Sequence, residues 1–201
     1  MLTLYYSPGS CSFASLIALH EAGAEFEARR MSLADGDQRK PEFLAVNPKG
    51  RVPVLSTEQG ILTETPAILV YIAQTYPDAN LIPKDAWNFG RMQAFNAYIC
   101  STVHVNHSHK QRGSRWADEP SSHEDMRRKV PETMAASMLM IEDEMFEGPW
   151  VMGEHYTVAD PYLYTICTWL EGDGVDIANY PKLSDFVKRM QAREAVIKAQ
   201  A

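Results

Sequence analysis

The feature that most constrains the fold is a change of residue pattern part-way along the chain. Residues 1–76 mix short runs rich in β-branched and aromatic residues with amphipathic segments, whereas the pattern after residue 86 is helical. The stretch 77–85 holds prolines and polar residues, which is typical of a linker. We therefore expect an α/β domain at 1–76, a linker at 77–85 and an all-helical domain at 86–201.

The order of the expected elements narrows the fold class further. In the first domain the pattern predicts strand, helix, strand, irregular segment, strand, strand and helix, at 2–6, 13–22, 26–31, 35–41, 52–55, 60–63 and from 65. This order predicts a small sheet covered by helices, as in thioredoxin-like domains. Helical periodicity then recurs at 86–111, 123–146, 158–170 and 180–190, which predicts a helical bundle.

Cys11 is the strongest chemical signal in the chain. It follows an apolar strand and a Pro-Gly turn, with Ser10 as the expected helix N-cap. The free N–H groups and the dipole of a helix N-terminus favour an anion, so this position predicts a lowered thiol pKa and a reactive cysteine. The alternative is a small buried hydrophobe, which we expect for Cys100 and Cys167 in their apolar helical patterns.

Charge and cysteine usage exclude several classes of function. The net charge is −7 and the basic residues are scattered, so nucleic acid and anionic membranes are not expected as partners. Three cysteines without a disulfide framework indicate a reducing compartment. No targeting segment or long apolar window is recognised, so we expect a cytoplasmic protein.

Two further motifs suggest places where a peptide-like ligand could bind. Pro53 interrupts a strand pattern, and the sequence alone favours an ordinary trans proline at a sheet edge. A cis bond is the alternative, and it would turn the Val52 backbone outward toward an extended ligand. Glu64 and Thr65 stand at the mouth of a helix, where they either hold a zwitterionic ligand end or simply cap the helix.

Four motifs together resemble the glutathione S-transferases, most closely the bacterial beta class. They are Tyr5-x2-Pro8-Gly9-x-Cys11-Ser12, Asn47-Pro48-Lys49-Gly50-x-Val52-Pro53, Thr63-Glu64-Thr65-x-Ala67-Ile68 and Gly153-x3-Thr157-x2-Asp160. The resemblance implies a thioredoxin-like domain with a cis Pro53, a helical second domain, glutathione as substrate and a homodimer. Asp160 is expected to act structurally in a capping box with Thr157, where its replacement with Ala would cost about 1 kcal/mol or somewhat more.

The resemblance also assigns roles to individual residues. Cys11 would contact the glutathione sulfur, the Val52 backbone at Pro53 would pair with the tripeptide, and Glu64 and Thr65 would hold its γ-glutamyl end. His104 would reach the site from the helical domain. Ser10 or a tyrosine such as Tyr5 would help to stabilise the thiolate. The glycine end is left to Lys40 or Lys49. The stretch around His107 departs from the beta-class pattern; its residues predict a polar lining of the second-substrate cleft, with Arg112, Arg115 and Trp116 nearby in the chain, rather than a metal site.

Three functions remain open on the sequence. The leading one is conjugation of glutathione to a small hydrophobic electrophile, a detoxification reaction, with Cys11 able to form a mixed disulfide with glutathione. The second is glutathione-dependent thiol–disulfide reduction, for which Cys11 would be indispensable. The third is a non-catalytic protein that binds hydrophobic ligands, because a fold alone does not choose among activities.

Overall fold

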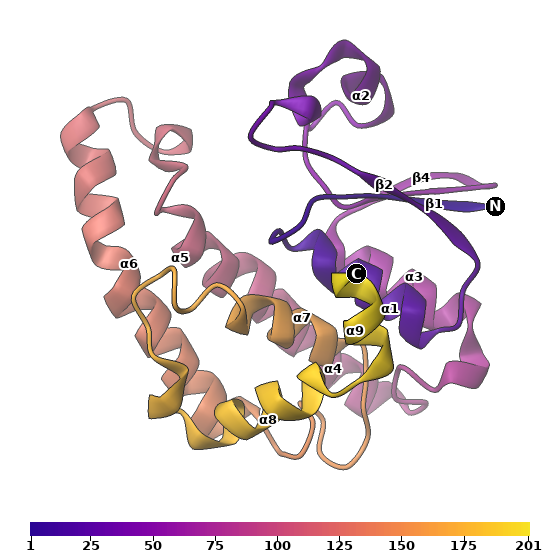
Figure 1. Ribbon diagram of the computed structural model, residues 1–201. Coiled ribbons are helices and arrows are strands. Elements are labelled where there is room, and N and C mark those ends of the chain that lie inside the picture. Colours follow the sequence, from indigo (N-terminus) through magenta and orange to yellow (C-terminus); the bar gives the residue numbers. More distant parts are fainter.

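The N-terminal part of the computed structural model, which describes residues 1–201, is built on a four-stranded sheet (Figure 1). Its strands are β1 (Leu2–Tyr6), β2 (Phe26–Arg30), β3 (Val54–Thr57) and β4 (Gly60–Thr63), in the order β2-β1-β3-β4. β2 runs parallel to β1, and β3 runs antiparallel to both β1 and β4. This mixed sheet confirms the expected thioredoxin-like arrangement.

The alternation of side chains along β1 and β3 explains why helices cover both faces of the sheet. Leu4 pairs with Leu55, and both are fully buried in the main core with α1 (Ser12–Glu21) and α3 (Thr65–Thr75). The next pair, Tyr5 and Val54, faces the opposite side, where Val54 packs with Phe43 of α2 (Pro41–Val46). Figure 1 shows α2 on one side of the sheet and α1 and α3 on the other.

The first-domain helices differ slightly from their expected positions. α1 begins one residue earlier than expected and is followed by Gly23, whose φ of +63° is left-handed and is well tolerated by glycine. α3 begins at Thr65 itself, with Glu64 in the N-cap position. The short α2 was not predicted: it begins where the irregular segment expected at 35–41 ends, and six residues are too few to display a clear helical period.

The second part of the chain is entirely helical apart from its connections. Its main helices are α4 (Ala86–Tyr98), α5 (His104–Ser108), α6 (Pro120–Met140), α7 (Ala159–Cys167), α8 (Pro181–Gln191) and α9 (Glu194–Gln200). A π-helical turn at Ile99–Val103 joins α4 to α5, so the single helix expected at 86–111 is one continuous but uneven rod. The expectation included no helix matching α9, which packs against α1.

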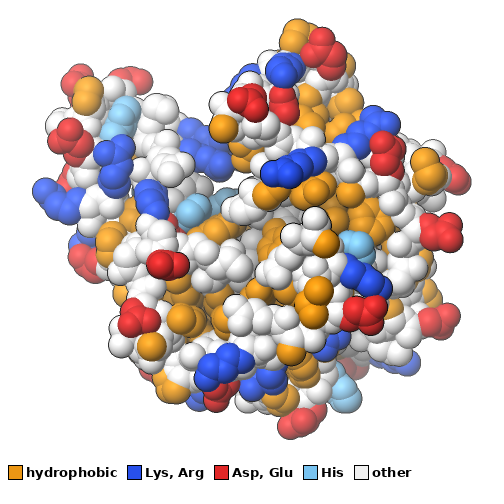
Figure 2. All heavy atoms as spheres, in the orientation of Figure 1, with side chains coloured by type: hydrophobic (Ala, Val, Ile, Leu, Met, Phe, Trp, Pro, Cys, Tyr) orange, Lys and Arg blue, Asp and Glu red, His pale blue; other side chains and the backbone are white.

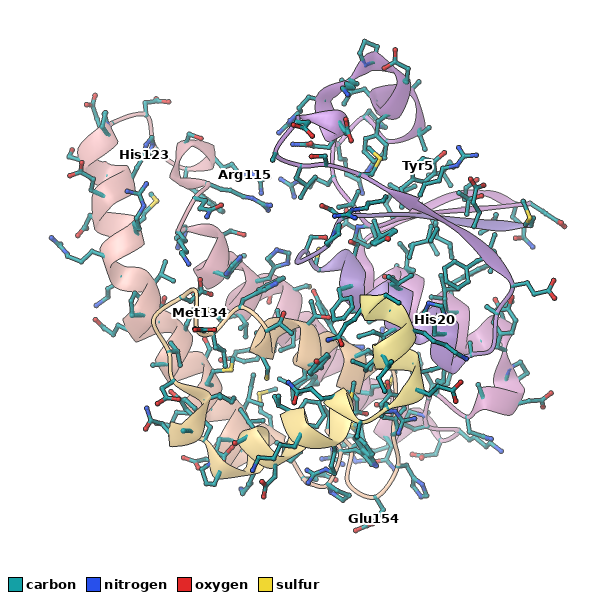
Figure 3. All side chains as sticks on the ribbon, viewed as in Figure 1. Tyr5, His20, Arg115, His123, Met134 and Glu154 are labelled. Atoms are coloured by element: carbon teal, nitrogen blue, oxygen red, sulfur yellow. The ribbon has the colours of Figure 1, made fainter.

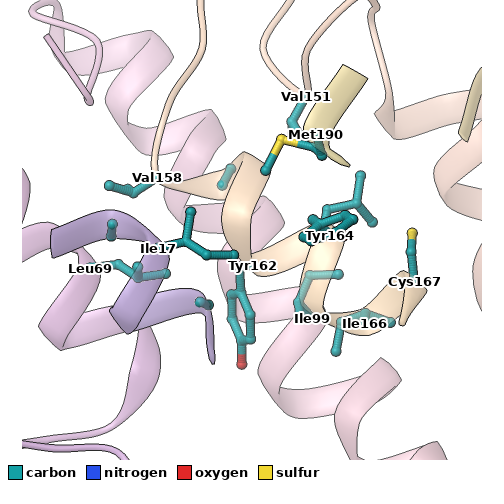
Figure 4. Packing of buried hydrophobic residues seen from close by; sticks show 14 of the residues in the cluster. Ile17, Leu69, Ile99, Val151, Val158, Tyr162, Tyr164, Ile166, Cys167 and Met190 are labelled. Atoms are coloured by element: carbon teal, nitrogen blue, oxygen red, sulfur yellow. The ribbon is translucent and has the colours of Figure 1, made fainter. Parts of the chain in front are cut away.

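The two parts share one hydrophobic core rather than resting loosely together. Ile17 of α1 and Leu69 of α3 lie beside Tyr162 of α7, and all three side chains are almost completely buried (Figure 4). A second connection joins Arg193 to Glu21 of α1 through two charge-assisted hydrogen bonds of 2.5 and 2.8 Å. The core therefore fixes the position of the cleft between the two parts. None of the helices is both long and apolar enough to cross a membrane.

Candidate active site

A cleft of about 1300 Å³ separates the two parts of the molecule on one side. Its walls come from the turn after β1, the segment before β3, the start of α3, and α5 with the loop that follows it. Figure 2 shows the hollow between the two lobes. Eleven of the 34 residues that line it are hydrophobic, so the cleft offers both polar and apolar surface to a ligand.

Cys11 lies in this cleft at the N-terminus of α1, held by a turn of serines. The Ser7 N–H donates to Ser12 Oγ at 2.9 Å, and Ser10 Oγ donates to the Ser7 carbonyl at 2.9 Å. Ser10 Oγ also lies 2.6 Å from Ser12 Oγ. The helix assignment makes Cys11, not Ser10, the N-cap residue, and the Ser10 hydroxyl is used within the turn. The structure thus gives Ser10 a local role in shaping the turn.

The Cys11 thiol differs from the expectation of a lowered pKa. Burial raises its pKa above the ordinary value of 9.0, because a desolvated thiolate is disfavoured. The Thr65 hydroxyl and the charge of Arg112 act in the lowering direction but do not outweigh burial. Sγ also donates a weak hydrogen bond to the Val52 carbonyl at 3.6 Å, which stabilises the protonated form. Near neutral pH Cys11 is therefore a thiol.

The Val52–Pro53 peptide bond is cis. The trans bond that the sequence alone favoured is therefore wrong, and the cis bond implied by the family resemblance is confirmed. Both residues line the cleft next to Cys11, and no group of the chain accepts a hydrogen bond from the Val52 N–H. That donor remains free for an extended ligand lying along this edge.

Glu64 and Thr65 line the cleft at the start of α3, where the Thr65 hydroxyl neighbours Cys11. Glu64 has a φ of +75°, a left-handed conformation that costs energy in a residue other than glycine and is often kept at functional sites. Its carboxylate is paired with Lys49, which also donates to Thr63 Oγ1 at 2.6 Å. Thr65 is buried and lines the cleft. An exposed carboxylate and free helix N–H groups therefore meet at one point.

Two histidines reach the cleft from α5 and pack on Trp169. The His104 ring lies 5.1 Å from the Trp169 ring, and His107 stacks on it at 4.2 Å. Burial and then the neighbouring charge of His107 and of several arginines lower the pKa of His104 to about 4, so its imidazole is neutral at pH 7. His107 Nδ1 lies 2.6 Å from the carboxylate of Asp173, whose side chain is fully buried. This contact fixes the orientation of the His107 ring.

Three residues that the sequence linked to ligand binding lie outside the cleft. The Tyr5 hydroxyl accepts a hydrogen bond from Arg29 at 3.0 Å, and Lys40 is paired with Asp37 at 2.6 Å. Neither residue lines the cleft, and Lys49 is paired with Glu64 instead of reaching into it. The basic lining of the cleft consists instead of arginines, and the sequence pointed only to the last two of them: Arg30, Arg39, Arg51, Arg112 and Arg115.

Other cleft residues were not recognised from the sequence. Cys100, expected to be buried, is exposed and lines the cleft, whereas Cys167 is buried as expected. Tyr162 and Trp169 also line it, although each sits in an apolar helical pattern that gave no sign of a binding role. Trp169 Nε1 donates to the Gly9 carbonyl at 2.9 Å, which joins α7's C-terminal extension to the Cys11 turn.

Comparison with known proteins identifies the family. Family models described as the N-terminal and C-terminal domains of glutathione S-transferase match residues 1–74 and 95–194. A glutathione S-transferase named GST-4.5 from Xanthomonas campestris pv. campestris is 30% identical over 95% of this chain and 93% of its own. The chain belongs to the glutathione S-transferase family. Its enzymatic class is therefore that of a glutathione transferase.

Solved structures of glutathione transferases share this fold throughout. A glutathione transferase homologue from Sulfitobacter, solved with bound glutathione, is 49% identical, with a TM-score of 0.98 over 100% of this chain and 97% of its own. A bacterial beta class glutathione S-transferase from Sphingomonas chungbukensis is 32% identical, with a TM-score of 0.85 over 98% and 96%. The resemblance to the beta class is thus confirmed. As to metals, no group of three or more potential ligands is present in this glutathione S-transferase.

Proposed function

We propose that glutathione lies across the cleft with its sulfur beside Cys11, and that its thiolate attacks a small electrophile held on the helical side. One observation carries this proposal: Cys11, the free Val52 N–H and the start of α3 line a single continuous cleft. An extended tripeptide placed along them would meet a backbone donor in the middle and a helix N-terminus at its amino-acid end. Glutathione is then the substrate, and the fold supplies proximity and orientation.

The roles of the glutathione-binding residues follow from this placement. The Val52 backbone would pair with the cysteinyl part of glutathione. Glu64 would share its carboxylate between Lys49 and the γ-glutamyl amine, while the Thr65 hydroxyl and the adjacent helix N–H groups would donate hydrogen bonds to the γ-glutamyl carboxylate. Arg39 and Arg51 line the cleft on the Val52 side, so they replace Lys40 and Lys49 as holders of the glycine carboxylate.

Two neutral donors are placed to stabilise the glutathione thiolate. Because burial keeps Cys11 protonated, its S–H group would leave the Val52 carbonyl and donate a hydrogen bond to the ligand sulfur instead of competing with it as a second anion. His104 is neutral and contributes an imidazole N–H from the other side. Hydrogen bonds to the charged form lower a pKa, so both groups favour the reactive thiolate of glutathione.

Cys11 also supports a slower disulfide reaction with glutathione disulfide. The Cys11 thiolate attacks one sulfur of the disulfide, a new Cys11–glutathione bond forms, and one glutathione leaves as a thiolate, so electrons and atoms balance. This exchange requires the Cys11 thiolate, whereas conjugation requires only the thiol as donor. The two activities therefore depend on Cys11 in different ways.

A paired assay separates these activities. Wild type and Cys11→Ala are compared in conjugation of 1-chloro-2,4-dinitrobenzene and in reduction of a glutathione mixed disulfide. We expect conjugation to fall by about tenfold, since a single weak donor is lost, and disulfide reduction to vanish. Cys100→Ser is the matched control, because it removes a second cleft thiol. Absence of conjugation in wild type that binds glutathione would contradict the transferase proposal.

The oligomeric state, domain limits and location are also proposed. Ile61 on β4 and Trp87 on α4 are exposed large hydrophobic residues on the two parts of the chain, 48% and 77% accessible. Burying them against a second copy would remove apolar surface from water, which supports a homodimer. Light scattering that returns a monomer would contradict it.

We likewise propose domains at 1–76 and 86–201 joined by 77–85, and a detoxifying role in the cytoplasm.

A further inference from the structure

The cleft has the opposite charge to the protein as a whole. The chain carries a net charge of −7, yet the cleft is lined by five arginines and by no lysine. Its only acidic lining residue is Glu64, which is already paired with Lys49. The remaining positive charge of the cleft is therefore not balanced by the protein itself.

The pairing of arginines divides sharply between the cleft and the rest of the molecule. Every arginine outside the cleft donates to an acid or to a backbone carbonyl; these are Arg29, Arg91, Arg127, Arg128, Arg189 and Arg193. The five cleft arginines take part in none of the ion pairs of the structure. Their guanidinium groups remain available to a ligand.

Four of these arginines are also close enough together for their positive charges to repel one another. Burial together with the charges of Arg112, Arg51 and Arg39 lowers the pKa of Arg115 to about 10. Holding like charges together in a partly enclosed space costs free energy unless an anion joins them. A bound carboxylate would remove that cost and gain charge-assisted hydrogen bonds at the same time.

The four arginines approach the cleft from two sides. Arg39 and Arg51 belong to the N-terminal domain, beside Val52, where a Cβ atom at Gly50 would meet Arg39 Nη1 at 3.1 Å. Arg112 and Arg115 follow α5 in the helical domain, and Figure 3 shows Arg115 reaching toward the other domain. The glycine carboxylate of one glutathione needs one guanidinium fork, so the pair on the helical side is left without a partner.

We propose that Arg112 and Arg115 form a subsite for a carboxylate group on the second substrate. This proposal rests on the glutathione transferase function proposed above and changes its substrate class. The electrophile is then not simply hydrophobic: a small apolar body lies against Trp116, Tyr162 and Trp169, and its carboxylate lies against the two arginines. Arginine suits this role better than lysine, because its planar fork binds both carboxylate oxygens.

A pair of matched electrophiles tests the subsite. 4-Chloro-3,5-dinitrobenzoate carries a carboxylate, whereas its methyl ester is neutral and otherwise nearly the same shape. In both, glutathione thiolate supplies the electron pair of the new C–S bond, and chloride leaves with the electrons of the C–Cl bond. Each kcat/KM is divided by the uncatalysed rate constant with glutathione at the same pH, which corrects for the different electronic activation of the two rings.

We expect the corrected kcat/KM of wild type to be about tenfold or more higher for the carboxylate than for the ester, because one charge-assisted hydrogen bond contributes a free energy of that size. Arg115→Gln should lower this ratio by about tenfold, and Arg115→Lys should restore it in part because it keeps the charge but loses the fork. Arg128→Gln is the matched control: this arginine is exposed, lies on α6 and pairs only with Asp125, so the ratio should not change. An Arg112→Gln variant provides a second, independent test of the subsite.

Binding without turnover keeps the subsite separate from the transferase reaction. 4-Methyl-3,5-dinitrobenzoate has no leaving group, and its binding is followed by quenching of the fluorescence of Trp116 and Trp169, both in the cleft. Tight binding that weakens in Arg115→Gln supports the subsite even if no conjugation occurs. The absence of conjugation would contradict the transferase proposal and not the subsite. Glutathione disulfide is titrated in parallel: a larger loss for it than for the benzoate would assign the carboxylate to a second glutathionyl group.

Three results would overturn the subsite. The first is that wild type shows no preference for the carboxylate over the ester. The second is that Arg115→Gln and Arg112→Gln keep the wild-type ratio of the two kcat/KM values. Alternatively, the variants would weaken glutathione binding and slow both electrophiles equally, which would mean that these arginines hold the glycine carboxylate of glutathione itself.

Discussion

Trp169 Nε1 donates a hydrogen bond to the carbonyl oxygen of Gly9, two residues before Cys11, at 2.9 Å. The same indole ring carries the stacked His107 and touches His104. One side chain of the helical domain therefore sets both the turn that presents Cys11 and the histidines that face it. The site is assembled by the packing of two domains, not by either domain alone.

Replacement of Trp169 with Phe should test this coupling. Phe keeps an aromatic surface under His107 but cannot donate to the Gly9 carbonyl, so a hydrogen bond of about 1 kcal/mol is lost. We expect a drop in melting temperature of a few degrees, about 2–4 °C for a chain of this size, together with a larger relative loss of kcat/KM. Trp150→Phe, at a half-buried tryptophan that does not line the cleft, is the control for the chemical change alone. Equal effects of both variants would contradict the coupling.

The raised pKa of Cys11 predicts how glutathionylation depends on pH. Only the thiolate attacks glutathione disulfide, and burial moves the Cys11 pKa above 9.0, so the rate of adduct formation should still be rising at pH 9. Mass spectrometry after timed exposure should find one glutathione on Cys11, with Cys11→Ala as the blank. A rate that levels off near pH 7 would mean that the thiolate is stabilised, as the position at the helix N-terminus first suggested.

The neutral state of His104 predicts a specific pH dependence of stability. Its pKa is about 4 in the folded protein and about 6.5 in the unfolded chain, so between these values the unfolded state binds more protons. Stability from this group is therefore fully present above about pH 6.5 and is lost as pH falls toward 4. Between pH 7 and pH 5 the loss should be on the order of 2 kcal/mol in urea unfolding, reduced by the partial exposure of the ring.

A His104→Gln variant isolates this contribution from other titrating groups. Its free energy of unfolding should fall less than that of wild type between pH 7 and pH 5, because the amide does not titrate in this range. The three-dimensional neighbourhood causes the effect: burial is the main contribution, followed by the charge of His107 and of three cleft arginines. Parallel pH curves for the two proteins would contradict it.

Arg193, the N-cap residue of α9, is joined to Glu21 of α1, and the two should contribute to stability as a pair. The guanidinium group donates two hydrogen bonds to the Glu21 carboxylate and lies 3.9 Å from the Tyr156 ring centroid. Only 11% of the Glu21 side chain is accessible, so solvent screens this pair less than a surface pair. A double-mutant cycle with Glu21→Gln and Arg193→Met should return a coupling of about 1–2 kcal/mol.

The exposed pair of Lys198 and Glu194 on α9 is the matched control for that cycle. Both of its side chains are more than half accessible, and the pair joins two turns of the same helix. Its coupling should be about 0.3–0.5 kcal/mol, as is usual for surface pairs. Similar coupling energies in the two cycles would mean that the contact with α1 adds nothing to an ordinary salt bridge.

What the sequence could predict depends on whether the signal is local. The strands, the helix after Cys11 and the motifs around Val52 and Glu64 are short-range patterns, and the structure contains each of them near its expected residues. Lys40 or Lys49 was predicted to hold the glycine end of glutathione, but neither lines the cleft; the sequence could not show that Arg51 meets Arg112 and Arg115, because they approach one another only after the domains pack. Trp169 was missed for the same reason: no local pattern separates a core tryptophan from one that lies beside a cleft.

Asp160 shows how long-range contacts change an expectation drawn from the sequence. The capping box is present in part: the Thr157 N–H donates to Oδ2 at 2.7 Å, but the Thr157 hydroxyl accepts from Ala159 and not from Asp160. In addition, the Val151 N–H donates to Oδ1 at 2.8 Å, a contact across a loop that no capping pattern contains. The carboxylate is completely buried.

Asp160→Ala should therefore cost more than the 1 kcal/mol expected for a cap. It leaves the Val151 and Thr157 N–H groups buried without an acceptor, and each such donor costs about 1–3 kcal/mol. We expect a loss of about 2–5 kcal/mol in urea unfolding and a smaller loss for Asp160→Asn, whose side-chain oxygen replaces one acceptor. Glutathione binding by the folded fraction should be unchanged, because Asp160 does not line the cleft. A selective loss of binding with normal stability would contradict this structural role.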